Sequence, residues 1–295
     1  MLNTVNYLIG VDGGGSGTRV AIANLDGFEL ARGSAGASGL RNGADFAWNS
    51  ILQAVTSAFY NYRRQTPDLA HMAIGMGLAG VHNKEWAEDF AGANPGFARL
   101  RLETDAYTTL LGAHQGRPGG IVATGTGSVG ESILNDGTRR QVGGWGFPCG
   151  DEAGGAWLGL RAINHLQQVL DGRDAASVFS DAILQRCGGN AAALFRWLAS
   201  ANQGSYAQLA PVVVDCASRN GIPIAVQIMQ EASREIVKIA IALDQSLTIP
   251  IALCGGLAQP YLTYLPTSLL DRLIPARGDS VSGALLMIKN AMEST

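Results

Sequence analysis

A short glycine-rich segment near the start of the chain has the residue types of a phosphate-binding loop. It consists of Asp12, Gly13, Gly14, Gly15, Ser16, Gly17 and Thr18. Glycines let backbone N–H groups converge on an anion without a Cβ in the way, and the hydroxyl groups of Ser16 and Thr18 add donors. The carboxylate of Asp12 would repel phosphate on its own, so its position predicts a Mg²⁺ ion between the two. Taken alone, the segment is also typical of a structural hairpin turn.

Two further glycine segments follow apolar stretches later in the chain. The first contains Thr124, Gly125, Thr126, Gly127 and Ser128, and the second contains Cys254, Gly255 and Gly256. The loop at 124–128 again alternates glycine with hydroxyl residues and opens the second half of the chain. Together with the first loop it predicts two loops that bind one polyphosphate from two sides. The backbone at 255–256 would turn sharply past a purine or ribose, although an ordinary strand-to-helix turn explains this segment equally well.

One carboxylate is placed where a phosphoryl-transfer reaction needs a base. Asp105 follows the apolar run Leu100–Glu103, a predicted strand, and begins a predicted helix. Phosphoryl transfer requires positioning, charge neutralisation and a group that accepts the proton of the attacking hydroxyl, and a carboxylate can accept it. The alternative is that Asp105, beside Thr104, only caps the helix.

A loop from Gly143 to Glu152 has the composition of a sugar-binding segment. It contains Trp145, Gly146 and Asp151. Carboxylates in such a loop accept hydrogen bonds from sugar hydroxyls while an aromatic ring packs nearby. Solvated acidic residues of an exposed loop are the alternative. Gly80, which ends the segment Gly77–Gly80, would line the same cleft or form a packing turn.

The predicted secondary structure is mixed α/β. Apolar runs predict strands at Val5–Val11, Arg19–Asn24, His71–Gly77, Leu100–Glu103, Ile121–Thr124, Val129–Asn135 and Ile249–Leu253. Helical spacing of apolar residues predicts helices around 48–59, 105–114, 154–171, 175–187, 190–200, 205–219, 223–246 and 279–292. A strand rather than a helix follows the first glycine loop, which excludes a Rossmann fingerprint. We expect two domains, 1–118 with about 277–295, and 119–276.

Composition excludes several function classes. The net charge is −3 and the three lysines are scattered, so we expect no nucleic-acid partner. No apolar run approaches the roughly 20 residues of a spanning helix, and no charged secretion signal precedes Arg19, so we expect a cytoplasmic protein with no membrane partner. The four cysteines form no C-x-x-C pair and are expected to be buried, reduced thiols.

The order and spacing of these motifs resemble those of a known superfamily. The segments DGGGSGT at 12–18, ETDA at 103–106, TGTGS at 124–128 and CGGLA at 254–258 resemble the phosphate-one, connect, phosphate-two and adenosine motifs of the sugar kinase, Hsp70 and actin superfamily. The segment GGWGFPCGDE at 143–152 is similar to a stretch of amino-sugar kinases. Within the superfamily the whole chain resembles the N-acetylglucosamine kinase and BadF/BadG/BcrA/BcrD ATPase group.

This resemblance implies a fold, an activity and a set of roles. The fold would be two ribonuclease-H-like, actin-like ATPase domains with a nucleotide and substrate cleft between them. The activity would be ATP-dependent phosphorylation of N-acetylglucosamine, glucosamine or a related hexose, with Mg²⁺ and a homodimer. Asp105 would be the general base, and Asp151 with the Gly146 backbone would contact the sugar.

One segment departs from the pattern of the resembled kinases. They carry an asparagine that helps to bind the sugar in a stretch of the form G-x-x-N-x-x-x-G, whereas Gly39 occupies that position here. Asn42, three residues on, is the substitute that we expect. The departure leaves the identity of the sugar open.

Two other functions compete with a sugar kinase. An ATPase activator component of a CoA-ester dehydratase or reductase system would need cysteines at a dimer interface to hold an iron–sulfur cluster. The cysteine considered for this role is Cys149, which lies inside the predicted sugar loop. A nucleotide-sensing or structural member without a small substrate is the third reading, and the intact base and sugar loop count against it.

Overall fold

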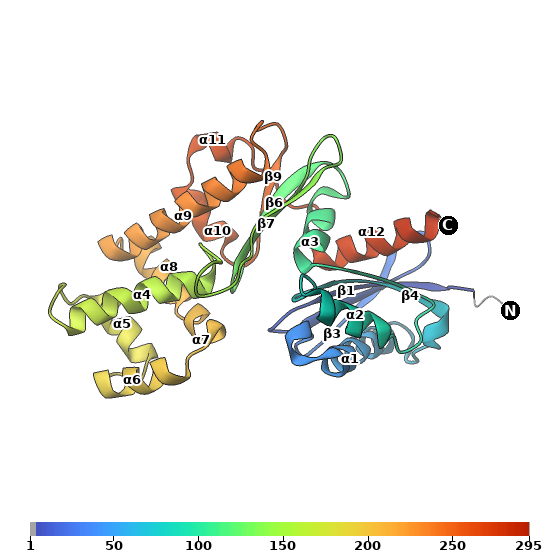
Figure 1. The fold of residues 1–295 in the computed structure, drawn as a ribbon, viewed down its shortest axis with the longest axis horizontal. Helices are drawn as coiled ribbons and strands as arrows, with labels where there is room; N and C mark the ends of the chain where they lie inside the picture. Colours follow the sequence, from blue (N-terminus) through green and yellow to red (C-terminus); the bar gives the residue numbers. More distant parts are fainter. Residues whose placement is uncertain (1–3, 295) are drawn as a thin grey trace. The chain divides into compact units, whose positions relative to one another are not determined.

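The computed structural model describes residues 4–294 (Figure 1). The predicted domains include residues 1–3 and 295, which lie outside the described residues. The chain forms two compact units. Unit 1 is Met1–Gly119 with Pro275–Thr295, and unit 2 is Gly120–Ile274. Each unit has its own sheet.

Unit 1 contains a five-stranded mixed sheet in the order β3-β2-β1-β4-β5. Its strands are β1 Tyr7–Gly13, β2 Thr18–Ala23, β3 Glu29–Ala35, β4 Met72–Leu78 and β5 Arg99–Glu103. Strands β1, β2 and β3 are antiparallel neighbours, whereas β4 is parallel to β1 and β5 is parallel to β4. The carboxyl ends of β1, β4 and β5 therefore meet at one edge of the sheet.

Helices cover both faces of this sheet (Figure 1). Ile9 and Val11 of β1 pack with α1, Ala44–Arg63, whereas Leu8 packs on the other face with α12, Ser280–Glu293. This is the two-residue alternation of a strand buried on both sides. The other helical elements of the unit are α2 Lys84–Gly92, α3 Asp105–His114 and the 3₁₀ turns η1 Leu40–Asn42 and η2 Leu69–His71.

Paired glycines set the distance between α12 and the sheet. Gly10 and Gly75 are register partners on β1 and β4. A Cβ at Gly10 would lie 2.5 Å from the carbonyl oxygen of Val281, and one at Gly75 would lie 2.3 Å from that of Ala284. The abundance of glycine thus reflects close helix packing as well as tight loops.

Asp279 fixes the start of α12 to the rest of unit 1. Its carboxylate accepts a hydrogen bond from the backbone N–H of Ser282 at 2.9 Å and forms an ion pair with Arg32 of β3. We expect Asp279→Ala to lower the free energy of unfolding by about 1–2 kcal/mol, because it removes both the cap and the ion pair. Asp279→Asn keeps a cap acceptor and should cost less than about 1 kcal/mol. Thermal unfolding of the two variants measures the difference. Equal losses of stability would contradict a separate contribution of the helix cap.

Because of the Asp279 carboxylate, we expect the free energy of unfolding to depend on pH. Burial alone would raise the pKa of Asp279, but hydrogen bonds from Arg32 and Ser282 outweigh it and hold the pKa at about 2. A depressed pKa in the folded state stabilises the protein above the ordinary aspartate pKa of about 4. This contribution is therefore lost as the pH falls from about 4 through 2, and Asp279→Asn should remove that part of the dependence.

Unit 2 contains a four-stranded sheet in the order β8-β7-β6-β9. The strands are β6 Gly119–Thr124, β7 Ser128–Ile133, β8 Arg139–Gly143 and β9 Ile251–Cys254. Strand β9 is parallel to β6, and β8 is antiparallel to β7. Leu273 forms an isolated parallel bridge to Ile251 at the outer side of β9. Unit 2 thus repeats the strand order of unit 1, with a single bridge at the place of the fifth strand.

Helices form most of unit 2. They are α4 Gly155–Leu170, α5 Val178–Arg186, α6 Ala191–Ser200, α7 Gln203–Ala207, α8 Ala210–Ser218, α9 Pro223–Leu243, α10 Ala258–Tyr261, η3 Leu262–Tyr264 and α11 Thr267–Leu270. Their buried apolar residues form one core with Val122 and Ile251 of the sheet. Within residues 4–294 no single helix has the length and apolar character needed to cross a membrane; one bent pair, Gln203–Ser218 with Pro223–Leu243, passes on length and composition alone.

Several elements differ from the sequence-based prediction. Strands β3 and β8 and helix α2 were not predicted, because the segments ELARGSA of β3 and RRQVG of β8 are largely exposed and mixed in polarity, and α2 buries only Phe90. The short elements η1, η2, α10, η3 and α11 were not predicted either. The single helix predicted at 205–219 is two helices, α7 and α8. Pro211 stands in the first turn of α8 and cannot donate a backbone hydrogen bond to a continuous helix.

Candidate active site

The carboxyl ends of three strands in unit 1 bring sequence-predicted residues together. Asp12 of β1 is the register partner of Gly77 of β4, which in turn pairs with Glu103 of β5. Gly80 follows β4, and Asp105 follows β5 by two residues. The candidate metal ligand, the glycine turn and the candidate base therefore lie at one edge of the sheet.

The glycine loop is the hairpin between β1 and β2. Gly14 donates to the carbonyl of Gly17 at 3.1 Å, and its own carbonyl accepts from the backbone N–H groups of Ser38 and Gly39. The Thr18 hydroxyl lies 2.6 Å from the carbonyl oxygen of Gly36 and 2.7 Å from the Ser38 hydroxyl. Thr18 is thus buried and secures the 36–39 segment, whereas Ser16 is exposed at the tip.

Packing against protein atoms requires glycine at some positions of this loop but not at others. A Cβ at Gly13 would lie 2.1 Å from the Ser38 hydroxyl oxygen and 2.7 Å from Leu78, so protein packing excludes it. A Cβ at Gly14 or Gly15 would meet nothing within 4 Å, and neither residue has a positive φ. Protein atoms therefore do not explain glycine at 14 and 15, whereas a ligand approaching the backbone closely would.

This division gives a matched pair of variants. We expect Gly13→Ala to lower the free energy of unfolding by about 1–3 kcal/mol through overpacking. Gly14→Ala should leave stability within about 0.5 kcal/mol. If the loop binds phosphate, as the sequence predicts, the added Cβ should also weaken ATP binding by about tenfold. Thermal unfolding and calorimetric titration with ATP separate the two effects. Unchanged ATP affinity in a stable Gly14→Ala variant would contradict a phosphate site here.

Asp12 is paired with an arginine that the sequence reasoning did not select. Both the Nε and the Nη2 of Arg19 donate to Oδ2 of Asp12, and the two residues face each other across the β1–β2 hairpin. The register of the hairpin was the available signal, because a four-residue loop places positions 12 and 19 opposite each other. Arg19 is largely exposed, so a positive charge stands beside the glycine loop.

Asp105 is the first residue of α3, and Thr104 is the N-cap. The Thr104 hydroxyl oxygen accepts from the backbone N–H of Tyr107 at 3.1 Å, so the capping role expected as an alternative for Asp105 belongs to its neighbour. Oδ1 of Asp105 accepts from the backbone N–H of Ala106 at 3.0 Å. Burial, together with the negative charge of Asp12, raises the pKa of Asp105. Its carboxylate is thus a stronger base than an exposed one.

The segments predicted to bind sugar and line the cleft in unit 1 meet the glycine loop. The N–H of Ala79 donates to the carbonyl of Gly13 at 2.9 Å, and the carbonyl of Ala79 accepts from Leu40 of η1 at 3.0 Å. Gly80 has a φ of 99° and Asn42 is exposed at the end of η1. A Cβ at Gly39 would lie 3.6 Å from the Gly14 carbonyl carbon, which is ordinary contact. The position of the missing asparagine therefore adjoins the loop.

In unit 2 the two glycine segments also lie side by side. They follow β6 and β9, whose ends pair at Ala123 and Cys254. Leu257 donates to the carbonyl of Thr124 at 3.2 Å, and a Cβ at Gly255 would lie 2.2 Å from that oxygen. Thr124 is buried, whereas Thr126 is exposed. A Cβ at Gly125 or Gly256 would meet nothing within 4 Å, as at Gly14 and Gly15.

The start of α4 is joined to the 124–128 loop. Gly155 donates to the carbonyl of Gly125 at 2.8 Å, and Ala156 donates to that of Thr126 at 2.9 Å. The Ser128 hydroxyl donates to the carbonyl of Glu152. The loop is therefore held to the start of α4, whereas the backbone of Gly125 stays open.

Asp151 is buried at the junction of this loop with the predicted sugar loop. It is 7% exposed and has a φ of 61°, which is uncommon for a residue with a side chain. Its Oδ1 accepts from the backbone N–H of Gly146 at 3.0 Å, and Oδ2 accepts from Nε2 of Gln203 at 2.9 Å. Burial raises the pKa of Asp151, and these hydrogen bonds oppose the rise. Gln203 is the second partner that sequence reasoning missed, and no local signal marks it.

Trp145 differs from Asp151 in its surroundings. Its side chain is 89% exposed, the highest exposure among the large apolar residues of the described range 4–294. Glu152, by contrast, is partly buried at the end of the same loop. An indole in solvent next to the Gly146 backbone is available for contact with a ligand.

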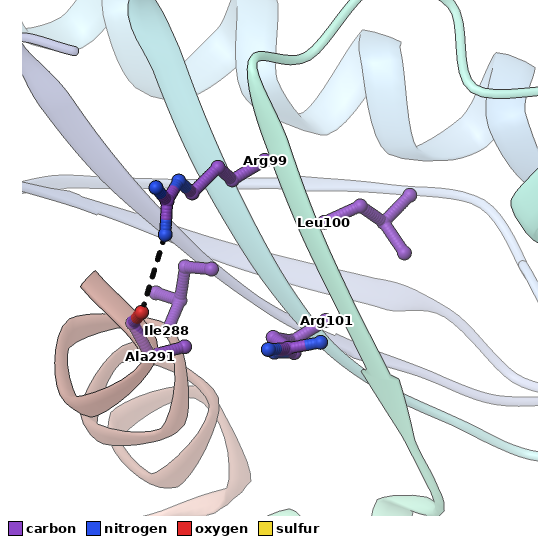
Figure 2. A pocket seen from close by; sticks show the side chains of 5 residues that line it. All are labelled: Arg99, Leu100, Arg101, Ile288 and Ala291. Atoms are coloured by element: carbon purple, nitrogen blue, oxygen red, sulfur yellow. Dashed lines mark hydrogen bonds between the residues drawn. The ribbon is translucent and has the colours of Figure 1, made fainter. Parts of the chain in front are cut away.

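A small basic pocket lies elsewhere on unit 1. It measures about 140 Å³, and Figure 2 shows Arg99 reaching the carbonyl of Ala291 while Arg101 lies on the same strand. The pocket is at the start of β5, whereas Asp105 follows its end. It is therefore separate from the residues selected above.

The chain is similar to known proteins over most of its length. Residues 9–270 match the model of the BadF/BadG/BcrA/BcrD ATPase family. The chain is 31% identical over 283 residues to the glucosamine kinase GspK of Vibrio cholerae, and the match covers 96% of this chain and 95% of that protein. It is similar, with 46% identity and a TM-score of 0.93, to the solved structure of a protein provisionally named an N-acetylglucosamine kinase from Chromobacterium violaceum, covering 96% of this chain and 99% of that one.

The fold extends to more distant sugar kinases. The chain matches a ROK family glucokinase from Streptomyces griseus, solved with glucose and AMPPNP, with a TM-score of 0.56 and 17% identity over 98% of this chain and 100% of that one. A likeness at this identity concerns the fold alone. The predicted α/β, actin-like ATPase fold is confirmed by these matches and by the two mixed sheets. By the extent of the family match and the identity to its relatives, the chain belongs to the BadF/BadG/BcrA/BcrD ATPase family.

Proposed function

We propose that the protein is an ATP-dependent amino-sugar kinase that transfers the γ-phosphate of ATP to a hydroxyl of glucosamine, N-acetylglucosamine or a related hexose. The observation that supports it most is the set of glycines with open backbone at strand ends. Gly14, Gly15, Gly125 and Gly256 have no positive φ, a Cβ added to any of them would meet no protein atom within 4 Å, and they follow β1, β6 and β9. Backbone that is open at three strand ends suits a nucleotide polyphosphate.

The glycine loops would hold the phosphates and the nucleoside. In this proposal Gly13, Gly14, Gly15, Ser16 and Gly17, with Thr18 behind them, bind phosphate groups of the nucleotide, and so do Thr124, Gly125, Thr126 and Gly127. The exposed hydroxyls of Ser16 and Thr126 are free to donate to phosphate oxygens. The backbone of Gly255 and Gly256 would lie close to the ribose or purine.

The residues around Asp12 fit a magnesium ion. Mg²⁺ in kinase sites needs only one or two carboxylates besides phosphate oxygens and waters. Oδ2 of Asp12 accepts from Arg19, which leaves Oδ1 available as a ligand, directly or through water. Bound there, Mg²⁺ would neutralise phosphate charge. Arg19 could then also interact with phosphate, because guanidinium groups pair well with it.

Asp105 would act as the general base. Its raised pKa favours accepting a proton from the attacking sugar hydroxyl as the γ-phosphate is transferred. Asn42, Gly80, Trp145, Gly146 and Asp151 are the proposed sugar-binding residues. The homodimer that the resemblance implies and the cytoplasmic location expected from the apolar and charge pattern remain predictions.

The cysteines favour a kinase over an ATPase activator. Cys187 and Cys216 are buried, Cys254 is half-buried, and burial raises the pKa of Cys187 and Cys254 to about 11. Cys149 is exposed, contrary to the expectation that all four thiols are buried. A cluster shared at a dimer interface would therefore have one accessible thiol per chain among the described residues, and this thiol lies in the loop assigned to the sugar.

An ADP-release assay over several sugars tests the proposal. The panel is N-acetylglucosamine, glucosamine, glucose and N-acetylmannosamine, each with Mg²⁺-ATP. We expect release to depend on an amino sugar and to exceed the rate without sugar by at least about 10²-fold. A rate that is the same with and without every sugar would contradict the proposed kinase.

A further inference from the structure

Gln203 connects the carboxylate of Asp151 to α7, a helix that lies outside the loops at 124–128 and 143–152. Gln203 is the first residue of α7, and its Nε2 donates to Oδ2 of Asp151 at 2.9 Å. The other oxygen of the same carboxylate accepts from the Gly146 backbone at 3.0 Å. One buried carboxylate therefore joins α7 to the loop at 143–150.

The same pair of side chains rests on the 124–128 loop. A Cβ at Gly127 would lie 2.2 Å from Oδ2 of Asp151 and 3.3 Å from Nε2 of Gln203. Only a residue without a side chain leaves room for the carboxylate and the amide at this place. The hydrogen bond between Asp151 and Gln203 thus lies where the loop at 124–128 meets the predicted sugar loop at 143–152.

Helix α7 is itself held firmly. A Cβ at Gly159 of α4 would lie 2.0 Å from the carbonyl oxygen of Tyr206, so the two helices are in backbone contact. The Tyr206 ring also packs on Phe147 of the 143–150 loop, with ring centroids 5.1 Å apart, and on Trp197, 5.0 Å apart. Gln203 is therefore presented to Asp151 from a fixed support.

We propose that Gln203 is a positioning residue that orients the Asp151 carboxylate and thereby holds the 143–150 loop against the phosphate loop. A buried carboxylate oxygen needs a donor, and the Gln203 amide supplies one. Without it, Oδ2 would be left unsatisfied and the carboxylate would turn or move toward water, which weakens its bond to Gly146. The consequence for the sugar rests on the proposed function.

Three variants of the pair test this role. Gln203→Ala removes the donor, and Gln203→Glu replaces it with an acceptor facing Asp151. The double variant Gln203→Glu with Asp151→Asn restores a hydrogen bond of reversed polarity with the same net charge, and Asp151→Asn keeps a side-chain oxygen for the Gly146 N–H. Gln208→Ala is the matched control, because Gln208 is the exposed C-cap residue that follows α7.

Hydrogen exchange of the 143–150 backbone is the deciding readout, because it requires no substrate. We expect exchange at the Gly146 amide to be about tenfold faster in Gln203→Ala and Gln203→Glu, as for loss of one hydrogen bond, and to return close to the original rate in the double variant. Gln208→Ala should not change it. In kinase assays, Gln203→Ala should raise the KM for the sugar by about tenfold.

Unchanged exchange at Gly146 in both single variants would overturn the inference, as would failure of the reversed pair to restore it. A different result separates the two proposals. If exchange responds as expected but the unaltered protein phosphorylates no sugar, the proposed function fails and the positioning role of Gln203 stands.

Discussion

Asp105→Asn is expected to lower kcat by about 10²–10⁴-fold while leaving the Kd for Mg²⁺-ATP and for the sugar within about threefold. Asparagine has nearly the same shape, and its Oδ1 can still accept the hydrogen bond from Ala106. Its amide cannot accept the proton of the sugar hydroxyl. The fold should also be unaffected, because Thr104 and not Asp105 caps α3. Steady-state kinetics with calorimetric titration of both ligands makes this measurement.

Asp45→Asn is the matched control for the base. Asp45 is an exposed carboxylate in the first turn of α1, so the same substitution there should leave kcat unchanged. An Asp105→Asn variant that keeps full activity would contradict the assignment. So would a loss of sugar binding equal to the loss of rate, which would make Asp105 a ligand rather than a base.

The pH profile gives independent evidence on the same residue. Burial and the charge of Asp12 raise the pKa of Asp105 above its ordinary value of about 4. The base must be deprotonated to act, so kcat/KM should fall as the pH decreases through this raised pKa. The acid limb should be absent from the residual activity of Asp105→Asn.

Gly255→Ala is expected to lower stability more than Gly13→Ala or Asp279→Ala. Gly255 has a φ of 93°, and a Cβ would lie 2.2 Å from the carbonyl oxygen and 2.7 Å from the carbonyl carbon of Thr124. Backbone strain and a clash with backbone that cannot rotate away should cost about 3 kcal/mol or more. The midpoint of thermal unfolding should fall by about 5–10 °C.

Gly256→Ala provides the comparison at the next position. Nothing lies within 4 Å of its Cβ, so the unfolding midpoint should change by less than about 2 °C. ATP binding should nevertheless weaken if the nucleotide passes this backbone. Equal thermal stability of Gly255→Ala and the unaltered protein would show that the ends of β6 and β9 are not packed as described.

The sequence predicted most strands and helices because their apolar patterns are strong. The buried run before the first glycine loop predicted β1, and helical spacing from Trp48 to Phe59 predicted α1. It did not predict β3, which is an edge strand with few buried side chains. Its pairing with β2 depends on backbone hydrogen bonds between distant segments, and these leave no pattern within the strand itself.

The site shows the same division between local and distant information. Loop composition selected Gly14 and Gly125, but it could not separate them from Gly13, whose neighbour Ser38 is distant in sequence. Likewise Asp151 was selected from its loop, whereas Gln203 lies 52 residues away in a helix whose contact with α4 depends on Gly159. Partners contributed by other elements become visible only when the chain is folded.

The most direct test of the proposed kinase activity is to follow the γ-phosphate of labelled ATP. With Mg²⁺ and an amino sugar, we predict that the label appears on the sugar, that little appears as inorganic phosphate, and that Asp105→Asn slows the transfer by about 10²–10⁴-fold. Label released only as inorganic phosphate, at a rate that does not depend on sugar, would contradict this activity.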